Sequence, residues 1–447
     1  MAAFGGDEIN AVVVDVGSWN VKAGYAGEDV PKAVFPGAVG VLEGDGDVEM
    51  ADENAAARSG GVTRHAKGGK TYLSGDNGAM FARPAMDVRT PFGPDGSIED
   101  WDALEAIYRH IFADKLAVGA KDAPVMIAEP SDLPAASRQK LVEIMFETFQ
   151  VPAVFLSKNH TLSMFATAKS SALVVDVGHQ HAVCAAVHDG YVLQKTIVRN
   201  PVAGALLSEL AHKVVTSATG NEVRPRYTFT RKQGASGDWT VEDADTTGIT
   251  KSFHAYHTAR VCGDIKEAVC KLSESKFTAD ELASHGSVKY ELPDGQTIEI
   301  DGQRFAVPEV LFDPSLAKCV EGGEAELSRL LGPGRAAQGL AASVKECIDR
   351  CDVDIMRDMW GSVTVCGGTS LFTSMRDRLE TQLTETAPVN MVTSKVRVHC
   401  PANDVERIYS TWIGGSILSS LGSFQQMWMS KQEYEEHGSG LIQRKAP

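Results

Sequence analysis

The chain has 447 residues, more than one compact core accommodates, and its length suits two domains. Apolar residues make up 43% and charged residues 23%, which is typical of a globular protein; no apolar run is long enough to span a bilayer, and no basic segment followed by an apolar one opens the sequence, which argues against a membrane or secreted protein. The formal net charge of −16 repels nucleic acid and argues against DNA binding by this chain alone.

The eight cysteines are scattered, without a Cys-x-x-Cys pair or a cluster of histidines beside them. This spacing is typical of reduced, buried thiols in a cytosolic or nuclear protein, and it argues against a zinc site.

Hydrophobic periodicity predicts strands and helices in alternation. Short β-branched runs bounded by glycine predict strands at 11–16 and 172–177. Apolar residues at helical spacing predict amphipathic helices at 99–116, 137–149 and 412–434. We expect Ser137 to cap the second helix and Gly422 to interrupt the third. Because the two kinds of element alternate, the fold class is α/β.

Two polar stretches break this pattern, at 43–70 and 229–250. Neither contains enough apolar surface to offset the entropy of ordering it, so both are expected to be mobile loops inserted in the fold, without chemistry of their own.

The segment 11–22, "AVVVDVGSWNVK", is a strand followed by a turn that suits an anion. Asp15 closes the strand and Gly17 permits a tight turn. Successive backbone N–H groups then form a small nest for an anion, at Ser18, Trp19 and Asn20. Lys22 is placed to reach back to a phosphate as a point charge.

The segment 172–183, "ALVVDVGHQHAV", repeats this pattern, with Asp176, Gly178, His179 and Gln180 in the equivalent places. Taken alone, each hairpin also fits an ordinary β-turn. As a pair they indicate two nests that hold a polyphosphate from both sides. The carboxylates that end the two strands would hold the water shell of Mg²⁺ beneath it.

A third strand, in "GSVTVCGGTSLF" at 361–372, ends in Gly367-Gly368 before a helix. Paired glycines allow the backbone to approach a flat ligand or a phosphate closely. This turn suits the nucleoside end of a nucleotide.

Long stretches of the sequence resemble actin. The similar words include "VKAGYAGEDVPKAVFPGAVG", "IMFETFQVPAVF", "YELPDGQTIEI", "CDVDI" and "WIGGSILSSLGSFQQMWMSKQEYEE". The resemblance implies the actin-like ATPase fold, in which two duplicated domains, each split into two subdomains, surround a nucleotide cleft. It places subdomain 1 at 1–36, 81–166 and 410–447, subdomain 2 at 37–80, subdomain 3 at 167–202 and 321–409, and subdomain 4 at 203–320.

Shorter words, "FGGDE", "EDWD" and "VHDGYVLQ", together with the two polar stretches, are similar to the nuclear class of actin-related proteins, the fourth class of that family. This resemblance implies a nuclear subunit shared by chromatin-remodelling and histone acetyltransferase complexes. Its partners would be monomeric actin and a long helix of the scaffold or motor subunit. Contact with histones or the nucleosome is left open, and no membrane is implied.

The family's nucleotide site is carried over residue by residue. Its phosphate and metal elements match Asp15, Ser18, Lys22, Asp176 and Gly178. Its adenosine pocket matches Gly204, Lys266, Glu267, Gly367, Gly368 and Thr369, with Phe372 in place of a tyrosine. Other positions depart from the pattern: Trp19 replaces a glycine, Asn159 the glutamine that positions the attacking water, His179 an aspartate, Val183 a histidine and Ile408 a lysine beside the adenine.

These departures affect the attacking water more than the phosphates. Phosphoryl transfer depends on positioning one water in line and on electrostatics. Asn159, His179 and Val183 are the degenerate catalytic positions, so we expect ATP and Mg²⁺ to bind and hydrolysis to be slow or absent. The alternative is that other side chains replace the lost groups. His179 and His181 also suggest a metal pair, but without a third ligand hydrogen-bonded histidines are the expectation.

Three functions compete. The first is a nucleotide-binding structural subunit; the second is a conventional, polymerising, ATP-hydrolysing actin; the third is a sugar kinase of the same superfamily. The resemblance also implies a groove for a partner helix in the first function. Its apolar contacts would come from Phe165, Ile417, Leu418 and Leu421, although core packing is the alternative for Leu421. The Met-rich "FQQMWMSKQ" likewise fits either an adaptable surface or core packing.

Overall fold

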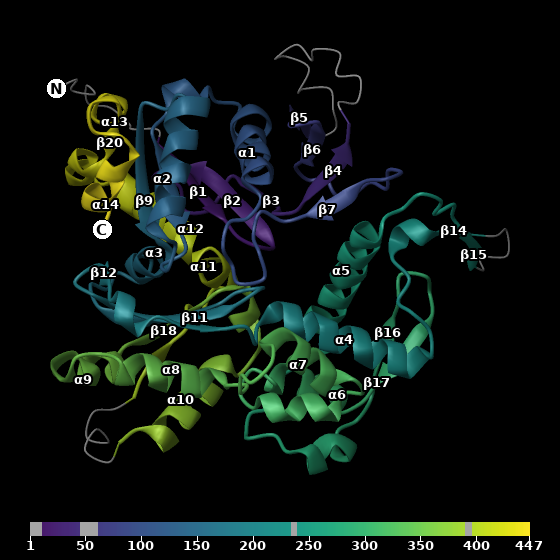
Figure 1. The fold of residues 1–447 in the computed structure, drawn as a ribbon. Coiled ribbons are helices and arrows are strands. Elements are labelled where there is room, and N and C mark those ends of the chain that lie inside the picture. The colour runs from purple at the N-terminus through teal and green to yellow at the C-terminus, as the bar shows by residue number, and fades with distance from the viewer. Residues whose placement is uncertain (1–10, 45–60, 234–238, 389–395) are drawn as a thin grey trace.

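The computed structural model describes residues 11–44, 61–233, 239–388 and 396–447 (Figure 1). Each of two large mixed sheets is surrounded by its own cluster of buried apolar side chains. Within the described part of the chain, no helix is long and apolar enough to cross a membrane. The predicted α/β class is confirmed.

The first large sheet has the strand order β20–β9–β8–β1–β2–β3. Its strands are β1 (Val12–Val16), β2 (Asn20–Tyr25), β3 (Ala33–Pro36), β8 (Val125–Glu129), β9 (Ala153–Lys158) and β20 (Met429–Ser430). β1 pairs antiparallel with β2 and parallel with β8, which in turn pairs parallel with β9.

The second large sheet repeats this plan with the order β12–β11–β10–β18–β19, and β13 also pairs with β11. Its strands are β10 (Ala172–Val177), β11 (Ala182–His188), β12 (Tyr191–Val192), β13 (Val198–Asn200), β18 (Val363–Cys366) and β19 (Val398–His399). β10 pairs antiparallel with β11 and parallel with β18. The register places Asp15 opposite Lys22 in one sheet and Asp176 opposite Val183 in the other. The duplication expected from the two hairpins is thus present in the topology.

Three smaller sheets complete the strands. β4 (Val39–Glu43), β5 (Thr63–Lys67), β6 (Lys70–Ser74) and β7 (Asp87–Arg89) form one in the order β5–β6–β4–β7. β14 (Phe229–Gln233) pairs with β15 (Trp239–Asp243), and β16 (Val288–Glu291) pairs with β17 (Thr297–Ile300).

The two polar stretches were expected to be loops. This prediction is wrong for the parts that form strands and correct for 244–250, which has no regular secondary structure. Residues 61–70 contain β5 and the start of β6, and the 229–250 stretch contains β14 and β15; 45–60 and 234–238 lie outside the described residues. In the hairpin of β14 and β15, cross-strand contacts of polar and charged side chains take the place of an apolar face. Lys232 Nζ lies 2.6 Å from Glu242 Oε2, and the Arg231 guanidinium lies 5.0 Å from the Trp239 ring centroid.

The helices are α1 (Trp101–His110), α2 (Ala135–Glu143), α3 (Asn159–Phe165), α4 (Gly204–Thr219), α5 (Lys251–Val269), α6 (Gln303–Glu309), α7 (Gly323–Leu331), α8 (Leu340–Asp349), α9 (Val353–Gly361), α10 (Met375–Thr386), α11 (Asp404–Ile408), α12 (Ser410–Ser420), α13 (Lys431–His437) and α14 (Ile442–Lys445). α1 and α2 confirm two predicted helices, and both continue into a π-helical turn. The predicted cap is wrong, because α2 begins at Ala135, directly after Pro134, and Ser137 lies inside it.

The predicted helix at 412–434 is only partly correct. α12 ends at Ser420, before Gly422 as expected, but the chain then forms a 3₁₀ turn and the short strand β20 before α13. Aromatic packing explains the break: the Phe424 ring lies 4.7 Å from Phe155 of β9, edge to face, and the Trp428 ring lies 6.4 Å from it. The Trp428 and Met429 side chains of the Met-rich segment are buried, while Met427 is exposed.

Helices α3 and α12 lie between the two large sheets and pack against each other (Figure 1). A methyl group at Gly414 of α12 would overlap the carbonyl of Leu162 in α3, so the close approach of the two helices requires glycine. Ser163 Oγ and Thr411 Oγ1 share a hydrogen bond of 2.9 Å across the same contact.

All eight cysteines are free thiols, as expected. Burial raises the pKa of several of them, to about 12 for Cys262 and for Cys347. Such thiols carry little thiolate at neutral pH and act as small core residues.

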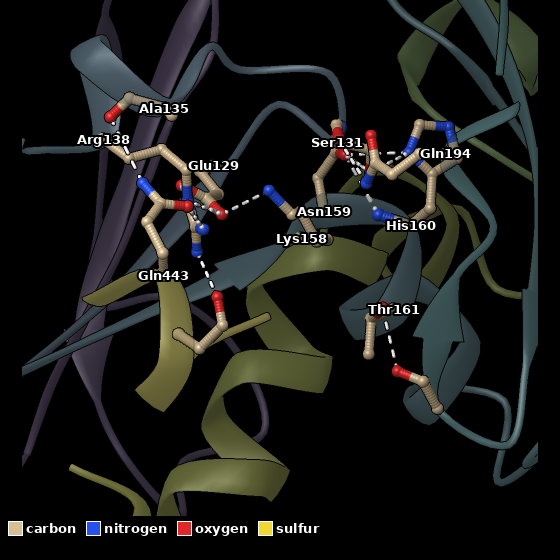
Figure 2. Close-up of polar contacts among 12 residues, drawn as sticks. Glu129, Ser131, Ala135, Arg138, Lys158, Asn159, His160, Thr161, Gln194 and Gln443 are labelled. Carbon is tan, nitrogen blue, oxygen red and sulfur yellow. Dashed lines mark hydrogen bonds and ion pairs between the residues drawn. The ribbon is translucent and has the colours of Figure 1, made fainter. Parts of the chain in front are cut away.

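A buried ion network ties the end of the chain to the first sheet (Figure 2). The carboxylate of Glu129, at the end of β8, forms ion pairs with Arg138 Nε at 2.9 Å and with Lys158 Nζ at 2.8 Å. Arg138 also donates to Gln443 Oε1 at 2.7 Å and to the carbonyl of Ala446. One guanidinium therefore joins β8, α2 and the C-terminal helix.

Arg138→Ala should lower the free energy of unfolding by about 3 kcal/mol or more, because it leaves a buried carboxylate with one partner and the C-terminal carbonyl with none. Urea unfolding measures this change. Arg376→Ala, which breaks an exposed ion pair with Asp377, is the matched control and should leave the free energy of unfolding nearly unchanged. Equal losses in the two variants would contradict the role of the network.

Candidate functional site

The carboxyl ends of parallel strands from both large sheets meet at one cleft of about 640 Å³. In open α/β sheets, ligands bind at this edge, because the loops that leave the strands are free to vary there. Residues that follow β1, β8, β9, β10 and β18 all line the cleft. The site is therefore shared by the two halves of the chain.

The first hairpin presents free backbone donors to the cleft. Gly17 N donates to Asn20 O at 3.1 Å and Gly37 N donates to Trp19 O at 2.9 Å, which fixes the turn. Within the described residues, nothing accepts from the N–H groups of Ser18 and Trp19. Unpaired donors of this kind form a nest that fits the oxygens of a phosphate.

The second hairpin is joined to two further elements. Gly178 N closes its turn on His181 O at 3.0 Å, and Gly178 O accepts from Thr369 Oγ1 at 2.8 Å and from Gly204 N at 3.2 Å. A methyl group at Gly204, the first residue of α4, would lie 2.5 Å from Thr369 Oγ1. No described residue accepts from the N–H groups of His179 and Gln180, so the second nest faces the cleft as the first does.

Two carboxylates and one ammonium lie between these nests. Lys22 Nζ lies 2.9 Å from Asp15 Oδ2. Burial acts to lower the pKa of Lys22, but Asp15, with a smaller effect from Asp176, outweighs it and raises that pKa above its ordinary value. Burial raises the pKa of Asp176, and the charge of Asp15 adds to this rise, while His160 and Lys22 oppose it. Carboxylate oxygens brought together in this way fit a hard divalent cation held through its water shell.

The remaining candidate residues also line the cleft: Lys266, Glu267, Gly367, Gly368, Thr369 and Phe372. Lys266 Nζ donates to Gly204 O at 3.3 Å and Ser208 Oγ at 3.2 Å. Burial lowers its pKa. Gly367 has φ of +90°, and a methyl group there would meet Asp176 Oδ1 at 2.5 Å, so only glycine suits this turn.

The indole of Trp19 packs against the imidazole of His179, across the cleft. Their ring centroids lie 4.2 Å apart with planes tilted by 31°, and Arg260 of α5 lies 5.8 Å from the Trp19 ring. Burial, with a smaller effect from Lys266, lowers the pKa of His179 to about 3. A neutral imidazole packed at a tilt against an indole therefore occupies the position where the resemblance implied an aspartate.

His181 does not pair with His179 as a metal site. Its Nδ1 lies 3.2 Å from Arg199 Nη1, and burial and the charge of Arg199 lower its pKa to about 4. The described residues contain no group of three His, Cys, Asp or Glu side chains that could hold a metal ion.

The cleft also has a polar back wall that was not predicted from the sequence (Figure 2). Ser131 Oγ lies 2.8 Å from both Asn159 Oδ1 and His160 Nδ1, and Arg199 Nε donates to Asp132 Oδ2 at 3.0 Å. Ser131 and Asp132 follow β8, and Asn159 and His160 follow β9, whose carboxyl ends lie beside that of β1, whereas Arg199 lies in β13. Polar residues after parallel strands were the available signal.

The structure brings the predicted nucleotide residues together. Of these residues, Gly204 alone does not line the cleft, and it lies directly against Thr369; the degenerate positions Asn159, His179 and Val183 and the adenine-side Ile408 line it as well. The residues predicted for the partner groove lie elsewhere. Ile417 and Leu421 at the end of α12 are 42% and 48% exposed, while Leu418 and Phe165 are half-buried. Core packing, the alternative for Leu421, is therefore wrong.

Comparison with known proteins identifies the family. The actin family model matches residues 6–447. The chain is 42% identical to actin-related protein 4 of Oryza sativa subsp. indica, over 99% of this chain and 100% of that protein. It is 41% identical to actin-related protein 4 of Arabidopsis thaliana, with the same coverage, and 31% identical to that of Schizosaccharomyces pombe, over 99% and 98%.

This chain therefore belongs to the actin family, as the sequence predicted, and its relatives are actin-related proteins of the fourth class. The actin-like fold follows from this membership. Proteins of the family bind a nucleotide together with a divalent cation, and the free donors and carboxylates of this cleft are consistent with both.

The pKa of His179 predicts a pH effect on stability. The folded pKa of about 3 lies below the ordinary 6.5 of an unfolded histidine, so its contribution is complete above pH 6.5 and is lost progressively down to about pH 3. In His179→Phe, which keeps a ring against Trp19 but cannot titrate, the stability lost between pH 7.5 and 5 should be smaller by about 2 kcal/mol. Urea unfolding of the nucleotide-free protein measures this difference. His437→Phe, at an exposed histidine, is the control and should keep the wild-type pH dependence.

Proposed function

We propose that this actin-family chain is an ATP-binding structural subunit of nuclear chromatin-remodelling and histone acetyltransferase complexes. In this proposal it binds ATP with Mg²⁺, hydrolyses it slowly or not at all, and forms no filaments. It pairs with monomeric actin on a helix of a remodeller motor or acetyltransferase scaffold subunit. Within such complexes, the proposal extends to direct contact with histones or the nucleosome.

The observation that carries the nucleotide proposal is the pair of nests. Free backbone donors of Ser18, Trp19, His179 and Gln180 come from two hairpins with the same topology and line one cleft. Lys22 adds a positive charge between them. Donors and an ammonium stabilise phosphate oxygens, and Asp15 and Asp176 supply carboxylates for the water shell of Mg²⁺.

The proposal of slow hydrolysis depends on what the cleft presents near the phosphates. Rapid hydrolysis needs an acceptor that orients one water and charges that stabilise the transition state. His179 is held neutral against Trp19, and Val183 offers no polar side chain. The donors for the phosphates are present, so in this proposal the chain binds ATP although it has lost the groups for rapid hydrolysis.

The nuclear role and the partners are supported by similarity and by one surface. The relatives are named actin-related protein 4 in plants and fungi. On this chain, Ile417, Leu421 and Met427 expose apolar side chains on and just after α12. An amphipathic partner helix would bury such side chains with its apolar face.

Purified protein should retain ATP and release phosphate far more slowly than conventional monomeric actin, because the donors are present and the water-orienting groups are altered. A single-turnover assay with radiolabelled ATP measures both, beside sedimentation to detect filaments. Phosphate release at the rate of conventional actin together with sedimenting filaments would support the alternative of a polymerising ATPase.

Lys22→Ala should reduce ATP retention and lower the melting temperature of the ATP-loaded protein. A ligand that binds only the folded state at a hundredfold excess over Kd stabilises it by about 2.7 kcal/mol, and this contribution would be lost. Lys121→Ala removes an exposed lysine and is the control. Full nucleotide occupancy in Lys22→Ala would contradict the two-nest model.

Ile417→Asp should weaken capture by a scaffold helix while ATP stays bound, because a carboxylate would replace an exposed apolar contact. Phe165→Ala tests the other side of the predicted groove. Loss of a central anchor costs on the order of 2 kcal/mol, roughly thirtyfold in affinity. Val353→Asp, at a 75% exposed valine on α9, is the matched control for the added charge. Co-purification with the helix at full yield in both variants would show that the groove lies elsewhere.

A further inference from the structure

A second hollow, of about 550 Å³, lies at the opposite end of the second large sheet from the cleft. Lys169, before β10, and Ser362, before β18, both line it, and the carboxyl ends of these two parallel strands lie at the cleft. The polar residues of the lining are Lys169, Ser362, Arg376, Glu380, Arg397 and His399. The hollow is therefore a separate site, at the amino ends of the strands.

Strand register brings several of these residues to one face of the sheet. β18 and β19 pair in parallel, with Thr364 beside His399. Arg397 continues this pairing through backbone hydrogen bonds of 3.3 and 3.1 Å around the start of β18. Alternate residues of a strand share a face, so Arg397 and His399 lie on the face opposite that of the buried Val398. Lys169 reaches the same face, where its Nζ donates to Thr364 Oγ1 at 3.1 Å.

Two cations of this face have no counter-charge. Burial lowers the pKa of Lys169, and no charged neighbour opposes this shift. Within the described residues, the Thr364 hydroxyl is its one hydrogen-bond partner, and the guanidinium of Arg397 has no acceptor. The segment 389–395, just before Arg397, contains no Asp or Glu in its sequence. Both positive charges are thus uncompensated, although the whole chain has a net charge of −16.

The carboxylates beside the hollow are already engaged. Glu380 Oε2 accepts from the backbone nitrogen of Val398 at 3.0 Å. Asp377 accepts from Arg376 Nη2 at 2.7 Å, which pairs the third cation of the lining. Three cations and one carboxylate line the hollow, so the charge of its lining is positive.

Two neutral donors accompany these cations. Burial lowers the pKa of His399, the charge of Lys169 adds to this shift, and Glu406 opposes it. The imidazole is therefore uncharged at neutral pH and carries one N–H group. The hydroxyl of Ser362 makes no hydrogen bond with a described residue, so it is the second donor.

We propose that this hollow binds an anion of the phosphate type, with Lys169 and Arg397 as its charged contacts and Ser362 and His399 as hydrogen-bond donors. A guanidinium fits two phosphate oxygens at once, and an ammonium adds a point charge. Two uncompensated cations match the double charge of a phosphate better than the single charge of a carboxylate. The inference does not depend on the proposed nucleotide function.

The size of the hollow indicates how the phosphate is carried. A space of several hundred Å³ holds a phosphate together with the group to which it is bonded. A free phosphate compound and a phosphorylated side chain of a partner protein both supply this chemistry, and two probes distinguish them.

The test uses the full chain loaded with ATP and Mg²⁺, so that the cleft is filled. Phosphorus NMR line broadening measures the affinity for inorganic phosphate. Fluorescence anisotropy measures the affinity for a labelled phosphoserine peptide beside its unphosphorylated form. Lys169→Ala and Arg397→Ala should each weaken binding at least about tenfold, the loss of one charge-assisted hydrogen bond. Lys289→Ala, at an exposed lysine of β16, is the control and should bind as the wild type does.

Each outcome has a definite meaning. Tighter binding of the phosphopeptide than of inorganic phosphate supports a phosphorylated partner, and binding of inorganic phosphate with no gain from the peptide supports a free phosphate compound. Wild-type affinity in both Lys169→Ala and Arg397→Ala, in variants that keep the wild-type melting temperature, would overturn the proposal. So would the absence of binding by either probe. A loss caused by Lys22→Ala but not by Lys169→Ala would also overturn it, because the probe would then lie in the cleft.

Discussion

The placement of two carboxylates, Asp15 and Asp176, at one edge between the sheets is the constraint on which the cleft depends. Each lies near the end of a strand of its own sheet; burial raises the pKa of Asp176, and the charge of Asp15 adds a smaller rise. Lys22 offsets part of this negative charge from the first hairpin, at 2.9 Å from Asp15. At this edge, two carboxylates and one ammonium from the two halves of the molecule lie close together. A divalent cation would offset the excess negative charge of the carboxylates, and Lys22 would offset part of the charge of a phosphate.

Much of this arrangement could be predicted from the sequence, because it depends on local patterns. A β-branched run that ends in Asp-x-Gly predicts both a strand and the turn after it. The repetition of this pattern predicted the corresponding hairpin of the second sheet. The relevant residues come together because parallel strands share one carboxyl edge. This also explains why candidates as far apart in the chain as Asp15 and Phe372 line the same cleft.

Two kinds of feature escaped prediction, both because they depend on distant partners. The hairpin of β14 and β15 has no apolar alternation and is held by cross-strand pairs such as Lys232 with Glu242, so a polar sequence looked like a loop. The contacts of Ser131 with Asn159 and His160 join the ends of β8 and β9, and Ser131 lies 28 positions from Asn159 in the chain. Such a contact leaves no local pattern in the sequence.

The first sheet is assembled from both ends of the chain. β1 and β9 come from its first 160 residues, whereas β20, α12 and the helix tied down by Arg138 come from its last 40. A ribosome makes these parts in order, and the entire second sheet is completed in between. The apolar strands of the first sheet therefore lack their C-terminal packing partners until the final residues leave the ribosome. Contacts of such high sequence separation are slow to form, and the incomplete species is prone to aggregate. Assistance during synthesis would shorten the exposure of those strands.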